Sequence, residues 1–311
     1  MRRAIVCGGA GFVGSAVVKE LVACGTEVFV IARPGFSKRM SESRLARLDI
    51  TILECDIREI SQVRDLIAGH EFDAWYQFAW DGLFHEPLTD YATQIMNIKW
   101  AMDAVVTAAE IGCRKFIGAG SISQLELQKE FGQLSQYDKH RVYKTAKQAC
   151  EYMGRSVAQE HNITFIWPLI TNIYGVGEFS NRLINSMIRN LLSGKRQSLS
   201  EANQYYDFIY IADAAKAFRL MGEKGQPDRN YVIASGTAQP LRHFLTQVRD
   251  IVAPYAELGF GEFPFNGVYL PKEAYSIAAL QEDTSFTPEV SFTEGIRRTA
   301  EWIAAEGADK G

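Results

Sequence analysis

Hydrophobic residues in the first half of the chain fall into short runs rich in β-branched and aromatic side chains, separated by longer stretches with helical spacing. The short runs predict strands near residues 3–7, 27–32, 50–54, 73–78, 114–119 and 163–167. The longer stretches predict helices near residues 12–24, 59–68, 88–111 and 139–160. This alternation is typical of an α/β fold with a doubly wound parallel sheet of Rossmann type.

The pattern changes after Pro168, where glycine, proline and aromatic residues interrupt the alternation. We expect residues 1–170, with 206–235 returning, to form the sheet domain. Residues 171–205 and 236–311 are expected to form a smaller C-terminal α/β lobe. Ligands of open parallel sheets bind beyond the carboxyl ends of the strands, so the lobe is expected to decide which substrate is bound.

Composition and charge narrow the class of protein. The 311 residues are 47% hydrophobic and 23% charged, which fits a globular chain of one large domain with a lobe. A net charge of −4 leaves no basic surplus to hold a phosphate backbone, which excludes nucleic acid as a partner. The apolar run Ala4–Cys7 ends in glycines and is too short for a signal peptide or a membrane span. We therefore expect a cytoplasmic protein without a membrane partner.

The spacing of cysteine and histidine predicts no metal site. The five cysteines are scattered, and no two of them have the spacing of a zinc or redox motif. The histidines are equally dispersed. We expect buried thiols in a reducing compartment.

A glycine-rich turn follows the first predicted strand. Gly8, Gly11 and Gly14 are spaced three apart and lead into a predicted helix that begins with Phe12 and Val13. Glycines allow a tight turn, close approach of the backbone to a pyrophosphate, and close packing of helix on strand. The backbone N–H groups at the helix N-terminus attract an anion. A glycine triplet also occurs in ordinary turns, but its place between strand and helix predicts dinucleotide binding.

The end of the second predicted strand indicates which dinucleotide binds. NAD sites usually place Asp or Glu there, to accept hydrogen bonds from the adenosine ribose. This strand ends in Ala32, Arg33 and Pro34 instead. A guanidinium pairs with a 2′-phosphate through two parallel hydrogen bonds, although Arg33 could also be a solvated side chain beside a loop. We expect NADP(H) in preference to NAD(H), with Arg33 discriminating and Lys38 or Arg39 helping.

Asp56 and Ile57 follow the third predicted strand. The Asp56 carboxylate could accept a hydrogen bond from the adenine amino group, or it could cap the helix predicted near residues 59–68. The sequence favours neither interpretation. We also place Ala79, which follows the fourth predicted strand, among the cofactor-binding residues.

One tyrosine and one lysine have the spacing required for proton transfer. Tyr143 and Lys147 lie four residues apart in a predicted helix and therefore on the same face. Tyrosine has a pKa of about 10, and an adjacent ammonium stabilises the phenolate and brings that pKa toward neutral pH. Two neighbouring tyrosines lack a lysine four residues later. We therefore predict a catalytic pair at Tyr143 and Lys147.

A hydroxyl group is expected beside this pair. Ser121 and Ser123 follow the fifth predicted strand, at the edge of the sheet where ligands bind. A serine there could hydrogen-bond the substrate oxygen that gains or loses the proton. We favour Ser121 over Ser123, and both could instead be turn or capping residues.

Together these motifs resemble those of the extended short-chain dehydrogenases/reductases, a group of nucleotide-sugar epimerases, dehydratases and reductases. Thr171–Gly175 is similar to the group's Asn-x-Tyr-Gly segment, and Tyr206–Ala215 is similar to the segment that returns from the substrate lobe. The resemblance continues to Trp302 near the end of the chain.

The resemblance implies a mechanism and a substrate class. Tyr143 would exchange a proton with a sugar hydroxyl or ketone while hydride moves to or from the nicotinamide. Lys147 would also hold the nicotinamide ribose, and Ser121 would polarise the carbonyl. Asn172 would help to hold the diphosphate of a nucleotide sugar.

The chain departs from the family pattern at positions that bear on the substrate. Many members carry arginines where this chain has Trp167-Pro168 and Tyr206, so a basic contact to the diphosphate is missing. Arg182, Arg189 or Lys195 could replace it.

After the fourth predicted strand, Trp80 and Asp81 stand where the family often has small residues. They could line the sugar site, or Trp80 could pack against the lobe. His85 is a weaker candidate for this site.

The resemblance leaves several reactions open. Family dehydratases carry an Asp-Glu pair directly after the hydroxyl residue, whereas this chain has Ile122 and Ser123, so dehydration lacks its acid and base. An epimerase usually keeps NAD bound, whereas a dissociable NADPH suits net reduction, so Arg33 favours a 4-keto-sugar reductase over a 4-epimerase. The further alternatives are an NADPH-dependent reductase of a non-sugar ketone and a non-catalytic NADP(H)-sensing regulator. Relatives of the regulator kind typically lack the Tyr-x-x-x-Lys pair.

The predicted helices near residues 88–111 and 139–160 are long and apolar enough to bury more than one face. In relatives, the equivalent helices of two subunits form a four-helix interface. The resemblance therefore implies a homodimer.

Overall fold

The computed structural model describes residues 1–67, 69–82, 88–130, 138 and 140–308. By their contacts the residues fall into two compact units, each described by itself below. Unit 1 consists of Met1–Ile170, Ala215–Val232 and Ala278–Phe286. Unit 2 consists of Thr171–Ala214, Ile233–Ile277 and Thr287–Gly311.

These limits differ in two places from the division expected from the sequence. The returning segment in unit 1 is Ala215–Val232, which is shorter than 206–235, and Ala278–Phe286 also belongs to this unit. A polar cluster explains the second difference. The carboxylate of Asp283 accepts hydrogen bonds from Nε of Arg229 at 2.9 Å and from the Tyr231 hydroxyl at 2.5 Å.

Unit 1 is built on a six-stranded parallel sheet of order β3-β2-β1-β4-β5-β6. Its strands are β1 (Arg3–Cys7), β2 (Glu27–Ala32), β3 (Thr51–Glu54), β4 (Ala74–Gln77), β5 (Lys115–Ile117) and β6 (Thr164–Ile166). Residues Ala4–Cys7 of the central strand are fully buried, as expected for a strand covered on both faces. All six predicted strands are present, and the doubly wound α/β fold is confirmed.

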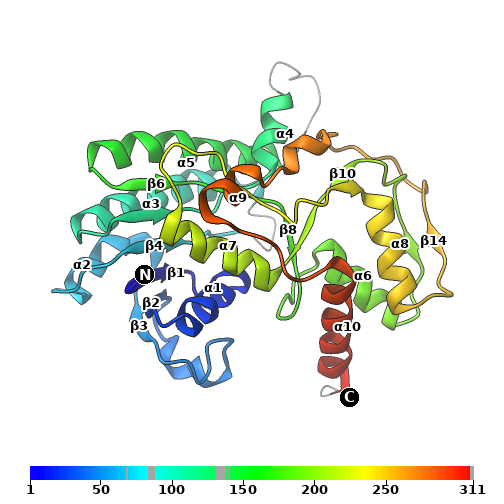
Figure 1. The fold of residues 1–311 in the computed structure, drawn as a ribbon, viewed down its shortest axis with the longest axis horizontal. Helices are drawn as coiled ribbons and strands as arrows, with labels where there is room; N and C mark the ends of the chain where they lie inside the picture. The colour runs from blue at the N-terminus through cyan, green and yellow to red at the C-terminus, as the bar shows by residue number, and fades with distance from the viewer. Residues whose placement is uncertain (68, 83–87, 131–137, 139, 309–311) are drawn as a thin grey trace. The chain divides into compact units, whose positions relative to one another are not determined.

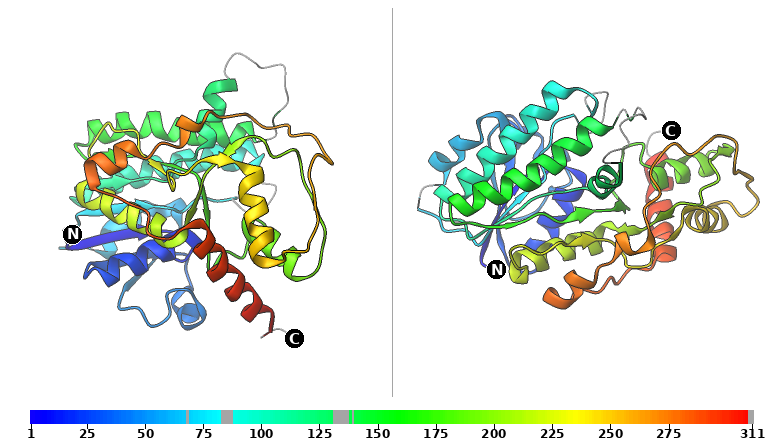
Figure 2. Two further views of the ribbon diagram at one scale, coloured as in Figure 1. Left: turned by 45° about the vertical axis from the view of Figure 1, so that its right-hand side comes forward. Right: turned by 90° about the horizontal axis from the view of Figure 1, so that it is seen from above.

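Helices cover both faces of this sheet (Figure 1 and Figure 2). On one face, α3 (Tyr91–Glu110) and α5 (Arg141–Glu160) lie side by side. On the other lie α1 (Phe12–Ala23) and the part of α7 (Ile211–Lys224) that belongs to unit 1. The sheet is thereby buried, and the carboxyl ends of its strands form one edge.

Two helical segments differ from the prediction. The helix expected near 59–68 is a 3-10 segment, η2 (Ile57–Gln62), followed by one α-helical turn, α2 (Val63–Leu66), because Glu59 departs from helical dihedral angles. The segment between β5 and α5 contains α4 (Ser123–Glu130), which was not predicted. Its sequence has only two leucines and therefore no continuous apolar stripe.

Among its described residues, unit 2 contains short two-stranded pairs and the α-helices α6 (Leu183–Leu192), α8 (Leu241–Val252) and α10 (Phe292–Ala308). A core of aromatic rings from Tyr174, Phe208, Phe244 and Phe292 holds these elements together, with centroid separations of 4.8–6.3 Å. The pairs are β8 (Asn172–Tyr174) with β11 (Phe208–Tyr210), β9 (Gln197–Ser198) with β14 (Leu258–Gly259), and β10 (Tyr205–Tyr206) with β13 (Gln239–Pro240).

The remaining elements are short. They are η1 (Ser37–Glu42), η4 (Lys272–Tyr275), α9 (Ala278–Thr284), and the pair β7 (Leu169–Ile170) with β12 (Val232–Ile233). Within the described ranges, none of the helices is long and apolar enough to cross a membrane.

Candidate active site

The glycine loop after β1 has the close contacts predicted for a dinucleotide cradle. Gly8 has a φ of +81°, and a Cβ atom there would lie 2.6 Å from the backbone nitrogen of Ala79. A Cβ atom on Gly14 would lie 2.3 Å from the carbonyl oxygen of Gly8. Both contacts are shorter than real Cβ atoms make, and L-residues rarely adopt the φ of Gly8, so the two positions require glycine.

The loop leads directly into the N-terminus of α1. The Gly11 N–H donates to the Gly8 carbonyl at 3.0 Å, which closes the turn. Gly11 is the N-cap of α1 and has no side chain to occupy the first backbone N–H groups. Phe12 and Val13, predicted to bind the cofactor, are the first residues of this helix. The turn and the helix N-terminus therefore fit the pyrophosphate of a dinucleotide.

Arg33 lies directly after β2 on a loop that is held by a carboxylate. Glu54 accepts hydrogen bonds from the backbone N–H groups of Gly35 and Ser37, both at 2.8 Å. The hydrogen bond from the Gly35 N–H, followed by those from the side chain and the N–H of Ser37, lowers the pKa of Glu54 to about 2. The Arg33 side chain is exposed, and its Nη2 lies 3.6 Å from Oδ1 of Asp81. The predicted helpers in η1 are exposed as well.

Asp56 is the N-cap of η2, which is one of the two interpretations left open by the sequence. Its carboxylate accepts the backbone N–H of Arg58 at 3.0 Å and pairs with the Arg58 guanidinium at 2.7 Å. The side-chain hydrogen bonds from Arg58 are the largest cause that lowers the pKa of Asp56 to about 2. Adenine binding by Asp56 and Ile57 stays a prediction.

Tyr143, Lys147 and Trp80 lie together at the carboxyl ends of β4 and β5. Nζ of Lys147 donates to the carbonyl oxygen of Ala119 at 2.8 Å and lies 3.5 Å from the ring centroid of Trp80. The same nitrogen is 5.8 Å from the ring centroid of Tyr143. The rings of Trp80 and Tyr143 meet edge to face at 6.1 Å. The spacing along α5 thus brings the predicted pair together, with an indole against the ammonium.

Burial changes the titration of Lys147. The side chain is almost completely enclosed, and this desolvation lowers the pKa of Lys147 from 10.5 to about 7. Its charge therefore changes close to neutral pH. Groups that titrate near the working pH are suited to acid–base catalysis.

Ser121 and Ser123 form a hydroxyl pair at the end of β5. The Ser123 hydroxyl donates to Oγ of Ser121 at 2.8 Å, and the Ser123 N–H approaches the same oxygen at 3.3 Å. The fully buried Gln124 supports this turn, because its Oε1 accepts the Ser121 N–H at 3.0 Å and the indole N–H of Trp167 at 3.1 Å. Its Nε2 donates to Glu151 at 2.8 Å. Gln124 was not predicted, because no local pattern reveals that a polar residue of α4 is buried.

The dipeptide Trp80-Asp81 is anchored by two buried amides of α3. The Trp80 indole N–H donates to Oε1 of Gln94 at 3.1 Å. Asn97 makes two bonds of 2.9 Å with the backbone of Asp81, accepting its N–H and donating to its carbonyl. Gln94 and Asn97 are 1% and 2% exposed, so both contacts are shielded from water. His85 lies outside the described residues.

The carboxylates of the α4 segment are bound to a second lysine. Nζ of Lys144 lies 2.9 Å from Glu126, 3.3 Å from Glu130 and 2.9 Å from Asp138. Lys144 follows Tyr143 directly, but it lies among these acids and is buried. The spacing of the sequence did not reveal this cluster.

Asn172 and Arg182, predicted to bind substrate, belong to unit 2. The Asn172 side chain donates to the carbonyl oxygen of Asp207 at 3.1 Å. Arg182 is the N-cap residue of α6 and lies 3.6 Å from a carboxylate oxygen of Glu178. Arg189, a possible substitute for the missing arginines, donates to backbone carbonyls of the preceding segment. The roles of Asn172 and Arg182 stay predictions.

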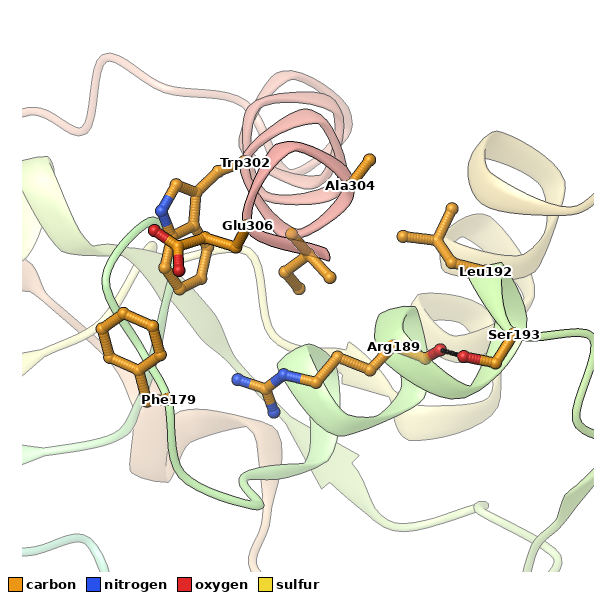
Figure 3. Close-up of a pocket in the computed structure, with 8 residues that line it drawn as sticks. Phe179, Arg189, Leu192, Ser193, Trp302, Ala304 and Glu306 are labelled. Carbon is orange, nitrogen blue, oxygen red and sulfur yellow. Dashed lines mark hydrogen bonds between the residues drawn. The ribbon is translucent and has the colours of Figure 1, made fainter. Parts of the chain in front are cut away.

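Unit 2 also contains an open pocket of about 520 Å³ between α6 and α10 (Figure 3). Phe179 and Trp302 lie together on one side of it, with ring centroids 5.1 Å apart. Of the residues that the sequence suggested for the substrate site, Arg189 lines this pocket. Its lining residues are Phe179, Arg189, Leu192, Ser193, Trp302, Ile303, Ala304 and Glu306.

A metal site is absent from the described part of the chain, where no group of three His, Cys, Asp or Glu side chains could hold an ion. The functional groups that the described residues present at the strand ends include a hydroxyl pair, a phenol and an amine.

Comparisons with known proteins agree with this arrangement. The model of the NAD dependent epimerase/dehydratase family matches residues 4–234. A dTDP-D-glucose 4,6-dehydratase from Mus musculus is 22% identical over 97% of this chain and 88% of its own length.

Several solved structures share the fold. A UDP-glucose 4-epimerase from Thermotoga maritima with UDP-glucose has a TM-score of 0.77 at 19% identity, covering 98% of this chain and 99% of that one. RMD from Pseudomonas aeruginosa with NADPH gives 0.77 at 19% identity, covering 98% and 100%. The enzyme WbmF of Bordetella bronchiseptica with NADH gives 0.77 at 20% identity, covering 99% and 93%.

Proposed function

Because this chain belongs to the NAD dependent epimerase/dehydratase family and is an NAD(P)-dependent enzyme, we propose that it reduces a nucleotide-linked 4-keto sugar with NADPH. One observation carries the proposal. The three residues that the proposed reduction needs, Ser121, Tyr143 and Lys147, are all present. In contrast, Ile122 and Ser123 occupy the positions where family dehydratases have an acid and a base.

The residues of the site have defined parts in the proposed reduction. The bound nicotinamide supplies the hydride. The Tyr143 hydroxyl gives a proton to the substrate oxygen, and the charged form of Lys147 stabilises the phenolate that remains. Ser121 donates a hydrogen bond to the same oxygen and so stabilises the charge that develops there. The Ser123 hydroxyl, which donates to Oγ of Ser121, orients it for this contact.

The surrounding carboxylates support reduction over dehydration. Dehydration needs an acid to protonate the leaving hydroxyl and a base to remove a proton. The acids of α4, Glu126 and Glu130, are held by the buried Lys144. Glu151 is held by Gln124 and Arg155. None of these carboxylates replaces the Asp-Glu pair after the hydroxyl residue.

Arg33 supports NADP(H) as the cofactor. It stands directly after β2, on a loop fixed by Glu54, where a carboxylate would favour NAD. Proteins of this fold have been solved with NADPH and with NADH, so the fold itself is compatible with either cofactor.

We test the proposal with a panel of nucleoside diphosphate 4-keto sugars and NADPH. Loss of one NADPH per sugar reduced, measured by absorbance and by analysis of the product, is the expected result. Tyr143→Phe should lower kcat by about 100-fold or more and leave the Kd for NADPH unchanged. Interconversion of two nucleotide sugars without loss of NADPH would instead establish a 4-epimerase, which needs the same three residues.

The homodimer is also a proposal, supported by an apolar surface on α3 and α5. The exposed residues of this surface are Tyr91, Ile95, Met96, Tyr152 and Met153, with 39–69% of each side chain accessible. Exposed apolar side chains on two helices that pack side by side are typical of a subunit interface. We also propose that the protein is cytoplasmic, as expected from the sequence.

A further inference from the structure

The ion pair between Arg33 and Asp81 crosses the edge of the sheet at the glycine loop. Arg33 follows β2 and Asp81 lies four residues after β4, and the strand order places β1 between these two strands. Neighbouring strands are about 4.8 Å apart, so the ends of β2 and β4 are separated by roughly 10 Å. The side chains nevertheless approach to 3.6 Å. The pair therefore spans the end of β1, where the loop of Gly8 to Gly14 begins.

Asp81 is presented to Arg33 from a fixed backbone. Asn97 binds both the N–H and the carbonyl of Asp81 at 2.9 Å, and Asn97 is buried. Oδ1 of Asp81 also accepts the N–H of Gly82 at 3.0 Å, which orients the carboxylate. The Arg33 side chain is 78% exposed, so it is the partner that moves more easily.

We propose that Asp81 is a cofactor-specificity residue, the counter-ion that Arg33 leaves when the 2′-phosphate of NADP(H) binds. The inference rests on the proposed preference for NADP(H) and deepens it. Asp81 was expected at the sugar site, whereas its ion-pair partner is Arg33, the arginine proposed to discriminate between the cofactors. Asp81 neutralises the Arg33 charge through an ion pair at 3.6 Å, and a 2′-phosphate would pair with the same guanidinium, so the two anions compete for one positive charge.

The competition has a functional consequence. While the cofactor is absent, Asp81 holds the Arg33 charge above the glycine loop. When the phosphate displaces Asp81, part of the binding free energy is lost in breaking the ion pair. NADP(H) therefore dissociates more readily than it would without Asp81, which suits an enzyme that exchanges its cofactor at every turnover.

The test measures binding of adenosine 2′,5′-bisphosphate and of adenosine 5′-monophosphate by titration calorimetry, with the full chain. Asp81→Asn keeps the shape and the acceptor for the Gly82 N–H but removes the charge. We expect the Kd for the bisphosphate to fall about two- to fivefold, the range for an exposed ion pair. The Kd for the monophosphate should not change. The gain should shrink in 0.5 M NaCl because salt screens exposed charges.

Two further variants separate the competition from other effects. Asp228→Asn removes an equally negative exposed group that pairs with Arg155 on α5, and it should leave both Kd values unchanged. In an Arg33→Gln background, Asp81→Asn should have no effect. A gain that persists there would mean that Asp81 repels the phosphate directly, and this would overturn the inference, as would an unchanged Kd in the single variant.

The proposed cofactor preference fails on a different result. If the unaltered protein binds the two nucleotides equally, the preference for NADP(H) is wrong. The competition between Asp81 and the phosphate is tested independently of that result. It is supported if Asp81→Asn tightens binding of the bisphosphate only when Arg33 is present, and it is wrong if binding does not tighten.

Discussion

Replacement of the buried Lys147 by methionine should remove a large pH dependence from the stability of the protein. In the folded chain burial lowers the pKa of Lys147 from 10.5 to about 7, whereas the unfolded chain keeps the ordinary value. Between these two pH values the unfolded state binds a proton that the folded state does not. The free energy of unfolding therefore falls as pH decreases from 10.5 to 7, and the contribution is constant below that range.

The size of the effect follows from the depression of the pKa. At 1.36 kcal/mol per pH unit, the contribution of Lys147 changes by about 5 kcal/mol over the whole range. Between pH 7 and pH 9 the expected change is about 2 kcal/mol, because the folded-state group is itself half protonated at pH 7, and this is a large share of a typical stability of about 5–15 kcal/mol. Methionine also loses the hydrogen bond to the Ala119 carbonyl. That loss changes the free energy of unfolding of the variant by the same amount at every pH, so the dependence of the free energy on pH is unaffected.

The assay is urea unfolding of both proteins at pH 7, 8 and 9, without cofactor, followed by far-UV circular dichroism. The free energy of unfolding of Lys147→Met, relative to that of the unaltered protein, should rise by about 1.3 kcal/mol from pH 9 to pH 8 and by about 1 kcal/mol from pH 8 to pH 7. Lys19→Met, which removes an exposed lysine of α1, serves as the control. Parallel stability curves for Lys147→Met and the unaltered protein would refute the assignment of a strongly lowered pKa to Lys147.

Three other substitutions test the cradle, the hydroxyl turn and the dimer. Gly14→Ala places a Cβ atom 2.3 Å from a carbonyl oxygen, and an overpacking cost of about 1–3 kcal/mol should weaken NADPH binding about tenfold, as titration calorimetry can show. Gln124→Leu leaves the Ser121 N–H and the Trp167 indole N–H without their acceptor, so it should lower the free energy of unfolding by about 2 kcal/mol or more in urea unfolding. The control, Gln128→Leu, changes an exposed residue of the same helix and should leave the free energy of unfolding unchanged. Ile95→Glu puts a charge on the exposed apolar surface of α3 and should yield monomers in sedimentation; an unchanged dimer would exclude this surface as the interface.

Local patterns identified the motifs because the chemistry of each depends on neighbours in the chain. The glycine turn, the arginine after β2 and the i, i+4 pair on α5 all follow from residue type and short spacing. The interpretation of Asp56 stayed open, since capping and adenine binding require the same residue at the same position. The structure shows the capping contact with the Arg58 N–H.

Such local patterns could not predict contacts between segments that are far apart in the chain. The ion pair of Arg33 with Asp81 joins residues that are 48 positions apart, and it exists because β1 brings the ends of β2 and β4 to one edge. Burial of Gln124 depends on α4, a helix whose few apolar residues gave no periodic signal.

The sequence by itself predicted the six strands of the sheet, the glycine loop after the first of them, and a tyrosine and a lysine on one face of a helix. These features depend on periodicity and on residue types a few positions apart. Only the tertiary structure decided the environment of the pair, in which Trp80 covers Lys147 and burial brings its pKa close to 7. The physical reason is that desolvation depends on everything that packs around a group, and that packing is assembled from segments far apart in the chain.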